Sequence, residues 1–407
     1  MRAIAKLKTN LNSSIRFWYF VTFTILFLSI LKGIRFPNTW SYTHFLFDYS
    51  FGFIKRGIVG EAIHQLNYPY LVSYEFFFIF SAAILSINIF LISLLLRDFI
   101  KSKQPLFIGC SLLFASSLAV VFLSHTIGYF DHIGLLVTLI AIRLYGFYKK
   151  IAFLLIAMPF SVLAHEATII IFFPVIFMSL LFAIDVEGYR IKQTLILGVF
   201  SVAILVFTFF VGNNILAESE AQQMYGNVQA NTEYPLRKDA FNVLYRNAKD
   251  NLSIMQHRWS NKIRLITLVQ SFLVTAPIFI AFIYFSTLIL IRKVEVQYYL
   301  IVLSILASLS PLILHLFAWD MHRWNTLTMV TSFLMLYIVY RSHLNNQPII
   351  IPSRIYPLFF LLIFANQISL IPLFDGYYVK QFPFVEHQKY IIDLVYEKNV
   401  FPYVPNY

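Results

Sequence analysis

Four short polar clusters interrupt a chain that is otherwise strongly apolar. The first contains Asp48, Lys55, Arg56 and Glu61 in the segment DYSFGFIKRGIVGE. A carboxylate beside a basic pair suits a site that takes a proton from a hydroxyl while it holds an anionic leaving group. In the structural alternative, Lys55 and Arg56 reach lipid phosphates and Asp48 pairs with one of them.

The second cluster contains His125, Asp131 and His132 in SHTIGYFDHIG. An aspartate and two histidines where a span enters the membrane could bind a metal or act as acid and base. Their spacing matches no standard zinc pattern. Asp131 could equally cap the N-terminus of a helix, where the helix dipole favours a carboxylate, and the two interpretations are compatible.

The third cluster is the pair His165 and Glu166 in VLAHEATIIIFFP. An ionisable pair between two apolar segments is costly unless it is paired, hydrated or functional. We interpret it as a candidate acid–base pair, and a structural pair buried against an arginine is the alternative. The spacing is not that of an HExxH zinc motif.

The fourth cluster is Asp320, His322 and Arg323 in FAWDMHRWN. The flanking Trp319 and Trp324 could belong to an aromatic belt that marks the membrane interface. An arginine among tryptophans also suits a diphosphate or the face of a sugar, because it offers bidentate hydrogen bonds and stacking.

The elements that must position these clusters are membrane helices. Of the 407 residues, 59% are hydrophobic and 12% are charged, and a soluble domain of this length could not bury so much apolar surface. Several apolar stretches reach the roughly 18–20 residues that cross a bilayer core, where helices satisfy the backbone. We therefore predict an all-α, polytopic transmembrane helical bundle. The single cysteine, Cys110, is interpreted as a packing residue.

Hydropathy predicts about eleven spans in one transmembrane domain, residues 1–373. The spans are residues 17–34, 75–96, 105–124, 130–148, 151–164, 168–184, 193–212, 266–291, 296–317, 326–341 and 355–373. Residues 151–184 could instead form one long tilted helix. A single helix would move every later loop to the opposite side of the membrane and place Arg292 and Lys293 outside. We therefore favour two short helices that meet at His165 and Glu166.

The basic residues give this topology a direction. With a cytoplasmic N-terminus, the cytoplasmic segments hold 16 basic and four acidic residues, whereas the opposite side holds 15 of each. The net charge of +12 thus falls on the cytoplasmic face, as the positive-inside rule expects, and requires no nucleic-acid partner. We interpret the basic N-terminal segment and the apolar run after it as an uncleaved anchor helix.

Three segments are predicted on the non-cytoplasmic side. The first outer loop, residues 35–74, is aromatic and predicts a helix or pair of helices in the interface, with apolar residues facing lipid. The polar loop 213–265 is long enough to form a cap over a cavity. The outer C-terminal tail, 374–407, predicts an amphipathic helix around 386–398. All four polar clusters fall on this same side, as the residues of one active-site cavity would.

The long first outer loop with Asp48, the short bent middle helices and the outward polar residues resemble the C-type superfamily of lipid-linked sugar transferases. Within this group the chain is similar to bacterial membrane proteins of capsule and O-antigen assembly, including repeat-unit polymerases of the Wzy type. The motifs DYSFGFIKRG, GYFDHIG, HE and WDMHRW carry the resemblance, which covers most of residues 1–373. The first loop has the single Asp48 where the family has an adjacent acidic pair, which leaves the need for a divalent cation open.

The resemblance implies transfer of a sugar or glycan from a polyprenyl-phosphate or diphosphate carrier to a hydroxyl. Asp48, or in its place Glu166 or Asp131, would deprotonate the acceptor. Arg56 and Arg323 would hold the phosphate, assisted by Lys55 and His322. The implied location is a bacterial inner membrane, with the lipid bilayer, the polyprenyl-linked glycan and other polysaccharide-assembly proteins as partners.

Three other classes of protein compete with this interpretation. A polysaccharide transporter or lipid flippase would show internal symmetry and polar residues near the midplane, and we detect no matching halves. A membrane acyltransferase would use His165 or His125 as its base, with essential residues facing inward or lining a channel. A purely structural membrane subunit is the third alternative.

Overall fold

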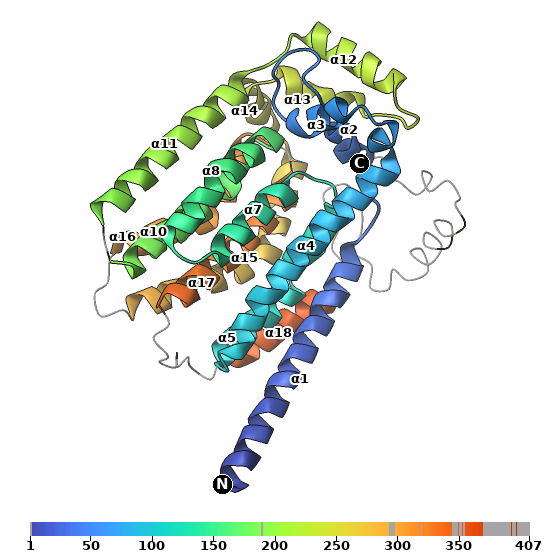
Figure 1. Ribbon diagram of the computed structural model, residues 1–407. Coiled ribbons are helices and arrows are strands. Elements are labelled where there is room, and N and C mark those ends of the chain that lie inside the picture. The colour runs from blue at the N-terminus through green and yellow to red at the C-terminus, as the bar shows by residue number, and fades with distance from the viewer. Residues whose placement is uncertain are drawn as a thin grey trace.

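The computed structural model describes residues 2–188, 190–292, 298–318, 320–343 and 355–368, with the single residues 349, 352, 392 and 396. Every regular element in these ranges is a helix (Figure 1). The amphipathic helix predicted around 386–398 lies almost entirely outside the described residues, and so does Trp319.

Seven helical segments among the described residues are long and apolar enough to cross a membrane. They are the Ile15–Gly33 part of α1 (Arg2–Gly33), α4 (Tyr74–Lys101), α5 (Pro105–Ser116) with α6 (Leu118–His125), α8 (Phe147–Ala164), α11 (Ile191–Asn213), α15 (Lys262–Ile291), and α16 (Tyr298–Leu309) with the 3-10 helix η3 (Ser310–Leu316). The other four predicted spans also contain helices: α7 (Asp131–Arg143), α10 (Phe173–Val186), α17 (Met321–His343) and α18 (Ile355–Ile368). The chain is therefore a membrane protein, and the regular elements of its described part are all helices.

Residues 151–184 form a hairpin rather than one long helix. Helix α8 ends at Ala164, His165 is extended with φ −157° and ψ 107°, and α9 (Thr168–Ile171) leads into α10. The two distant ends lie together, because the Phe147 amide donates to the Glu187 carboxylate at 2.9 Å. The predicted pair of short helices is confirmed, and the single tilted helix is wrong.

Helix α17 forms the buried centre of the bundle and contacts α10, α15 and α16. Its Phe333 is fully buried and stacks on Phe114 of α5, with 3.9 Å between ring centroids. Helix α11 lies at the periphery and exposes Ile191 and Phe209. An outer helix with exposed large apolar side chains is what a bundle surrounded by lipid requires.

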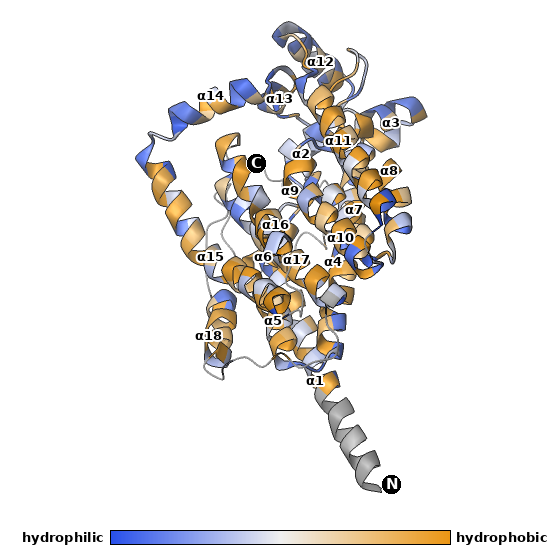
Figure 2. Ribbon diagram, turned by 90° about the vertical axis from the view of Figure 1, so that its left-hand side faces the viewer, coloured by the Kyte–Doolittle hydropathy of each residue, from blue (hydrophilic) through white to orange (hydrophobic). Residues whose placement is uncertain are grey.

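The loops at one end of the bundle fold into short helices that lie together (Figure 1). These are α2 (Thr39–Phe45) and α3 (Ile58–Leu66) in the first loop, and α12 (Glu218–Ala230), η2 (Lys238–Phe241), α13 (Asn242–Tyr245) and α14 (Ala248–Arg258) in the cap loop. Figure 2 shows that α12 and α14 are more hydrophilic than the bundle helices. The predicted pair of first-loop helices is therefore present, and the cap loop is helical.

The first loop differs from the prediction in where its apolar residues point. In α2, the aromatic residues Tyr42 and Phe45 are buried, and so is His44. Phe47 packs with Met224 and Phe241 of the cap loop in one hydrophobic cluster. The prediction that apolar residues here face lipid is wrong for α2, because α4 and the cap loop cover them. Phe45 packs on Phe77 of α4, and Tyr42 packs on Phe77 and on Tyr234 of the cap loop.

Helices α7 and α17 run in the same direction and carry polar contacts at both ends. At their C-terminal ends Arg143 donates to Asp98 of α4 and to Tyr337. The Arg341 guanidinium donates to the backbone carbonyls of residues 142 and 143. At about 1.5 Å per residue, Asp131 at the start of α7 lies roughly 18 Å from Arg143. The two ends are thus distinct polar layers separated by apolar packing.

Candidate functional site

The centre of the candidate site is an ion pair between the first turns of α17 and α7. The Arg323 Nε and Nη2 atoms both lie 2.6 Å from the Asp131 Oδ2 atom, and both side chains are buried. Arg323 also lies over the rings of Tyr129 and Trp324, with its central carbon 4.9 Å and 4.7 Å from their centroids. A second carboxylate acceptor is Asp320, whose Oδ2 atom lies 3.0 Å from Arg323 Nη1.

His165 extends this ion pair toward the α8–α9 turn. Its Nε2 atom lies 3.2 Å from Asp131 Oδ1 and 3.2 Å from Arg323 Nη2, and its Nδ1 atom lies 3.5 Å from Glu166 Oε2. In the neutral ring with the proton on Nδ1, Nε2 accepts from Arg323. In the protonated ring, Nε2 can donate to Asp131. A carboxylate oxygen therefore lies next to each of the two ring nitrogens.

Glu166 in turn is held by Arg56 of the first loop. The Arg56 Nε and Nη2 atoms donate to the two carboxylate oxygens at 2.9 Å and 2.8 Å, a bidentate geometry. Arg56 has a φ of 63°, in the left-handed region that side chains other than glycine rarely occupy. Strained backbone of this kind is characteristic of functional sites. Nearby, Gly60 lets α3 approach the Phe47 carbonyl, which an added Cβ would meet at 2.0 Å.

A pocket opens beside these groups and is here named the arginine pocket. It holds about 290 Å³ of empty space, counted to its open mouth, between α2, the α6–α7 turn, Arg56 and α17. Its lining residues are Trp40, Ser41, His44, Arg56, Gly128, Tyr129, Phe130, His165 and Arg323. Two arginines from distant parts of the chain thus line one cavity together with two imidazoles.

Sequence reasoning missed His44, Trp40 and Tyr129 as site residues. The His44 Nε2 atom lies 3.4 Å from Arg56 Nη1, and Trp40, one turn earlier on α2, stacks edge-on against the His44 ring. The spacing of four in TWSYTHF was the available signal, since residues i and i+4 share a helix face. Tyr129 lies in GYFDHIG, beside residues that were singled out for their charge.

Burial and charge set the protonation of the groups in the first loop and the turn. Burial alone would raise the pKa of Glu166, but the Arg56 charge and the hydrogen bonds from His165 and Arg56 hold it well below its ordinary value. Burial, together with the charge of Arg56, lowers the pKa of His44 well below its ordinary value. Near pH 7 the Glu166 carboxylate is therefore ionised and His44 is neutral.

Asp48, the first-choice base, is not among the groups that contact this cluster. Its carboxylate accepts from the backbone and the hydroxyl of Ser50, at 3.0 Å and 2.5 Å, and lies 3.6 Å from His64. A short aspartate two residues before a donor closes such a turn with its own side chain. The structural alternative, in which Asp48 pairs with Lys55 or Arg56, is wrong, because Arg56 binds Glu166 and Lys55 donates to the Arg246 carbonyl at 2.6 Å.

Four further predicted residues lie at the edge of the cluster or support it: Lys55, His125, His132 and His322. Burial lowers the pKa of Lys55, whose charge also interacts with Glu166. His125 is buried at the end of α6, and its carbonyl accepts from Arg35 at 3.0 Å. The His132 Nε2 atom lies 3.2 Å from the Thr126 carbonyl. Among the described residues, the hydrogen bonds of the cluster include none from the His322 ring.

Two further observations bear on cation binding and on helix capping. No group of three or more histidine, cysteine or acidic side chains in the described ranges is arranged to hold a metal ion. Asp131 occupies the first turn of α7, as the dipole interpretation predicts, but its carboxylate binds Arg323 and makes no capping hydrogen bond. The charges that neutralise Asp131 are therefore those of side chains.

Fold and site together define a helical membrane protein with a buried arginine–carboxylate–histidine cluster at one end of its bundle. Comparison with protein-family models, with curated proteins and with solved structures finds no match.

Proposed function

We propose that this protein transfers a sugar or glycan from a polyprenyl-phosphate or diphosphate carrier to a hydroxyl acceptor on the non-cytoplasmic face of a bacterial inner membrane. The observation that carries the proposal is that Arg56, Arg323 and His165 line one pocket, and that two carboxylates contact these side chains. Such a pocket offers an anion site and an acid–base pair in one place.

In the proposed reaction the phosphate of the carrier binds between the two guanidinium groups. Glu166, released from Arg56 as that arginine turns to the phosphate, takes the proton of the acceptor hydroxyl. The acceptor oxygen forms a bond to the anomeric carbon while the bond from that carbon to the phosphate oxygen breaks, and the electron pair stays on the phosphate. The proton on Glu166 can then pass to His165, whose Nδ1 atom is 3.5 Å away.

Glu166 is a better candidate for the base than Asp48 or Asp131. Asp48 is engaged in a local turn with Ser50, and Asp131 is 5% exposed and held by Arg323. The Glu166 side chain is 24% exposed and sits at the edge of the cluster. The three cationic side chains of Lys55, Arg56 and Arg323 balance the three carboxylates of Glu166, Asp131 and Asp320. An added phosphate must therefore displace a carboxylate from an arginine.

The proposed membrane arrangement has eleven crossings, a cytoplasmic N-terminus, and first-loop helices at the outer interface. The alternation of helix directions supports it, because Asp131, His165 and Arg323 meet at one end while Asp98, Arg143 and Arg341 meet at the other. The basic residues predicted as cytoplasmic include Arg143 and Arg341. The candidate site then lies at the outer end, under the cap loop.

Cell-surface glycan length tests this function in the native host. Glu166→Ala, Arg56→Ala and Arg323→Ala should each shorten or abolish the surface glycan at normal protein level. The matched control is Arg143→Ala, which breaks the ion pair of Arg143 with Asp98 at the other end of the bundle. The exposure of these two side chains, 26% and 25%, is close to that of the Arg56–Glu166 pair. Normal long glycan in all three site variants would exclude the transferase. Loss of a flippase would have a different effect, because glycan-loaded carrier would then remain on the cytoplasmic side.

A further inference from the structure

A hydrogen-bonded network of three buried side chains, His315, Asn325 and Ser271, joins η3, α17 and α15. The His315 Nε2 atom lies 2.8 Å from the Asn325 Oδ1 atom, and the Asn325 amide donates to the Ser271 hydroxyl at 2.8 Å. The three residues are 6%, 0% and 4% exposed. An amide oxygen only accepts, so the proton of the neutral His315 ring is on Nε2. No step of the proposed reaction uses this network.

The network holds the helix that carries Arg323, on the side away from the site. Asn325 follows Arg323 by two residues, so the two side chains leave α17 roughly 200° apart around its axis. Arg323 pairs with Asp131 of α7, whereas Asn325 bonds residues of η3 and α15. The first turns of α17 are therefore held from both sides, and a rotation of the helix would break both sets of contacts.

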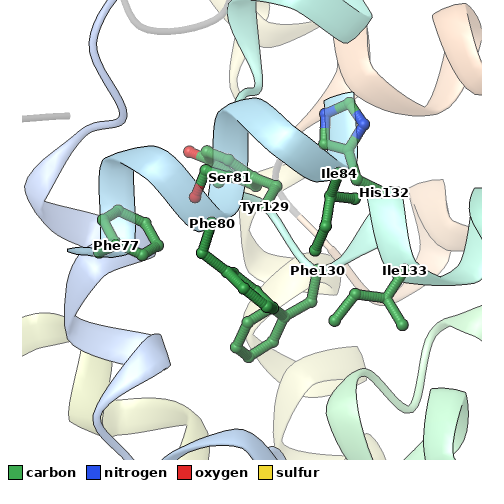
Figure 3. A pocket seen from close by; sticks show the side chains of 9 residues that line it. Phe77, Phe80, Ser81, Ile84, Tyr129, Phe130, His132 and Ile133 are labelled. Atoms are coloured by element: carbon green, nitrogen blue, oxygen red, sulfur yellow. The ribbon is translucent and has the colours of Figure 1, made fainter. Parts of the chain in front are cut away.

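The partners of Arg323 leave its guanidinium little room to move by itself. Arg323 pairs with Asp131 and lies over the ring of Tyr129, and both of these partners are buried. Tyr129 also lines, with Phe77 and Ser81 of α4, a space that has room for about one water molecule (Figure 3). The place of the guanidinium thus depends on where the first turn of α17 lies.

The 3-10 helix η3 contacts both halves of the candidate site. The Ser310 hydroxyl donates to the Ile171 carbonyl of α9 at 3.4 Å, and α9 begins two residues after Glu166. Through His315 the same short helix bonds α17. A short 3-10 stretch that continues an α-helix often marks a functional position. Here it contacts both the segment that follows Glu166 and the helix that carries Arg323.

We propose that His315 and Asn325 are positioning residues for the transfer reaction: they fix the rotation of the first turn of α17 and thereby place Arg323 at the carrier phosphate. The role of Arg323 rests on the proposed function, whereas the link from His315 to Arg323 through α17 does not. In the proposed reaction neither positioning residue touches the substrate. A misplacement of about 1 Å can cost about 100-fold in rate, so the bond between His315 and Asn325 should matter to transfer.

The test is solid-state NMR of the full chain in lipid nanodiscs with ¹⁵N-labelled arginine. The Nε–H resonance of Arg323 is identified by its loss in Arg323→Lys. His315→Phe removes the ring donor, and it should shift this resonance and lower the transfer rate between about tenfold and 100-fold. His315→Gln places an amide donor near the Nε2 position and should restore the wild-type resonance and most of the transfer. His315→Asn, whose amide is too short to reach Asn325, should match His315→Phe and replaces it if that variant does not fold.

The matched control is Thr331→Val. The buried Thr331 hydroxyl donates to the Ser308 carbonyl at 2.6 Å and so links α17 to α16, eight residues after Arg323. Its loss should leave the Arg323 resonance and the transfer rate unchanged. The double variant His315→Phe with Arg323→Lys should transfer no more slowly than Arg323→Lys alone, because both changes act through one guanidinium. Simple loss of folded protein would lower transfer by the same factor in both backgrounds.

An Arg323 resonance that stays unchanged in His315→Phe and His315→Asn would overturn the inference. Failure of His315→Gln to restore the resonance would also overturn it, and so would an equal loss of transfer in the wild-type and Arg323→Lys backgrounds. The resonance separates this inference from the transferase. A shift in His315→Phe that His315→Gln reverses, together with no transfer by the wild type, would refute the reaction and leave the placement of Arg323 by His315 standing.

Discussion

The guanidinium of Arg56 makes two parallel hydrogen bonds to the carboxylate of Glu166, although the two residues are 110 positions apart. This contact joins the first loop, residues 35–74, to the turn between α8 and α9. Through His165 it continues to the ion pair of Asp131 and Arg323. The contact between Arg56 and Glu166 thus connects polar motifs that are separate in the sequence into one cluster.

The free energy of unfolding should depend on Arg56 and Glu166 jointly. Arg56→Gln and Glu166→Gln should each lower it by about 1.5–3 kcal/mol, because each leaves a charged partner unsatisfied. The double variant should be less destabilised than the sum, with a coupling of about 0.5–3 kcal/mol. Chemical unfolding of the purified protein in detergent measures these differences. Strict additivity would show that the two side chains do not interact in solution.

Acid should destabilise the wild type more than the Glu166→Gln variant. The folded pKa of Glu166 lies below the ordinary value of 4.5, so its ionised form stabilises the protein above about pH 4.5. That contribution is lost as the pH falls through the folded pKa. Thermal melting between pH 7 and pH 3 should show a steeper decline for the wild type, and parallel curves would mean that Glu166 is not held ionised by its neighbours.

Lysine should not replace arginine at position 323. Arg323 bonds Asp131 through two nitrogens and Asp320 through a third, and it lies over two aromatic rings, which one ammonium cannot reproduce. We expect Arg323→Lys to reduce glycan transfer at least tenfold. Arg341→Lys, which alters the arginine over Tyr145 at the other end of the bundle, is the control and should retain most of the transfer. Equal transfer by both variants would remove Arg323 from the site.

Reporter fusions test the proposed orientation. A reporter fused after Val211, near the end of α11, should be active only on the outer side, and one fused after Gly188, before α11, only in the cytoplasm. The two positions flank a single helix, so they must give opposite results if α11 crosses the membrane. A cytoplasmic reporter after Val211 would invert the arrangement and move the candidate site to the inner face.

Much of the fold could be predicted because hydrophobic runs and charge bias are local signals. Each of the eleven apolar runs that were predicted as spans contains a helix in the structure. The basic residues Arg292 and Lys293 predicted the reversal at His165, since a continuous helix would have violated the charge rule. The polar motifs around Arg56, Asp131, Glu166 and Arg323 were also found, because charged residues are rare in an apolar chain.

The pairing within the site could not be predicted, because it depends on which distant segments meet. Asp48 and Arg56 are close in sequence, yet Asp48 bonds Ser50 in a local turn while Arg56 reaches Glu166. His44 was missed because it carries no charge pattern of its own and gains its role from packing against Arg56. Lipid-facing helices were predicted where α4 and the cap loop in fact cover α2, since hydropathy does not distinguish lipid from a protein surface.

The most direct test of the proposed transferase is a transfer assay with purified protein. The protein in nanodiscs is incubated with polyprenyl-linked glycans extracted from the host membrane, and mass spectrometry follows the extended glycan and the released carrier phosphate. The wild type and Arg143→Gln should both give product. Glu166→Gln should lower the rate at least about 100-fold at equal folded protein, as loss of a general base does. Product formation by Glu166→Gln at the wild-type rate would contradict the account.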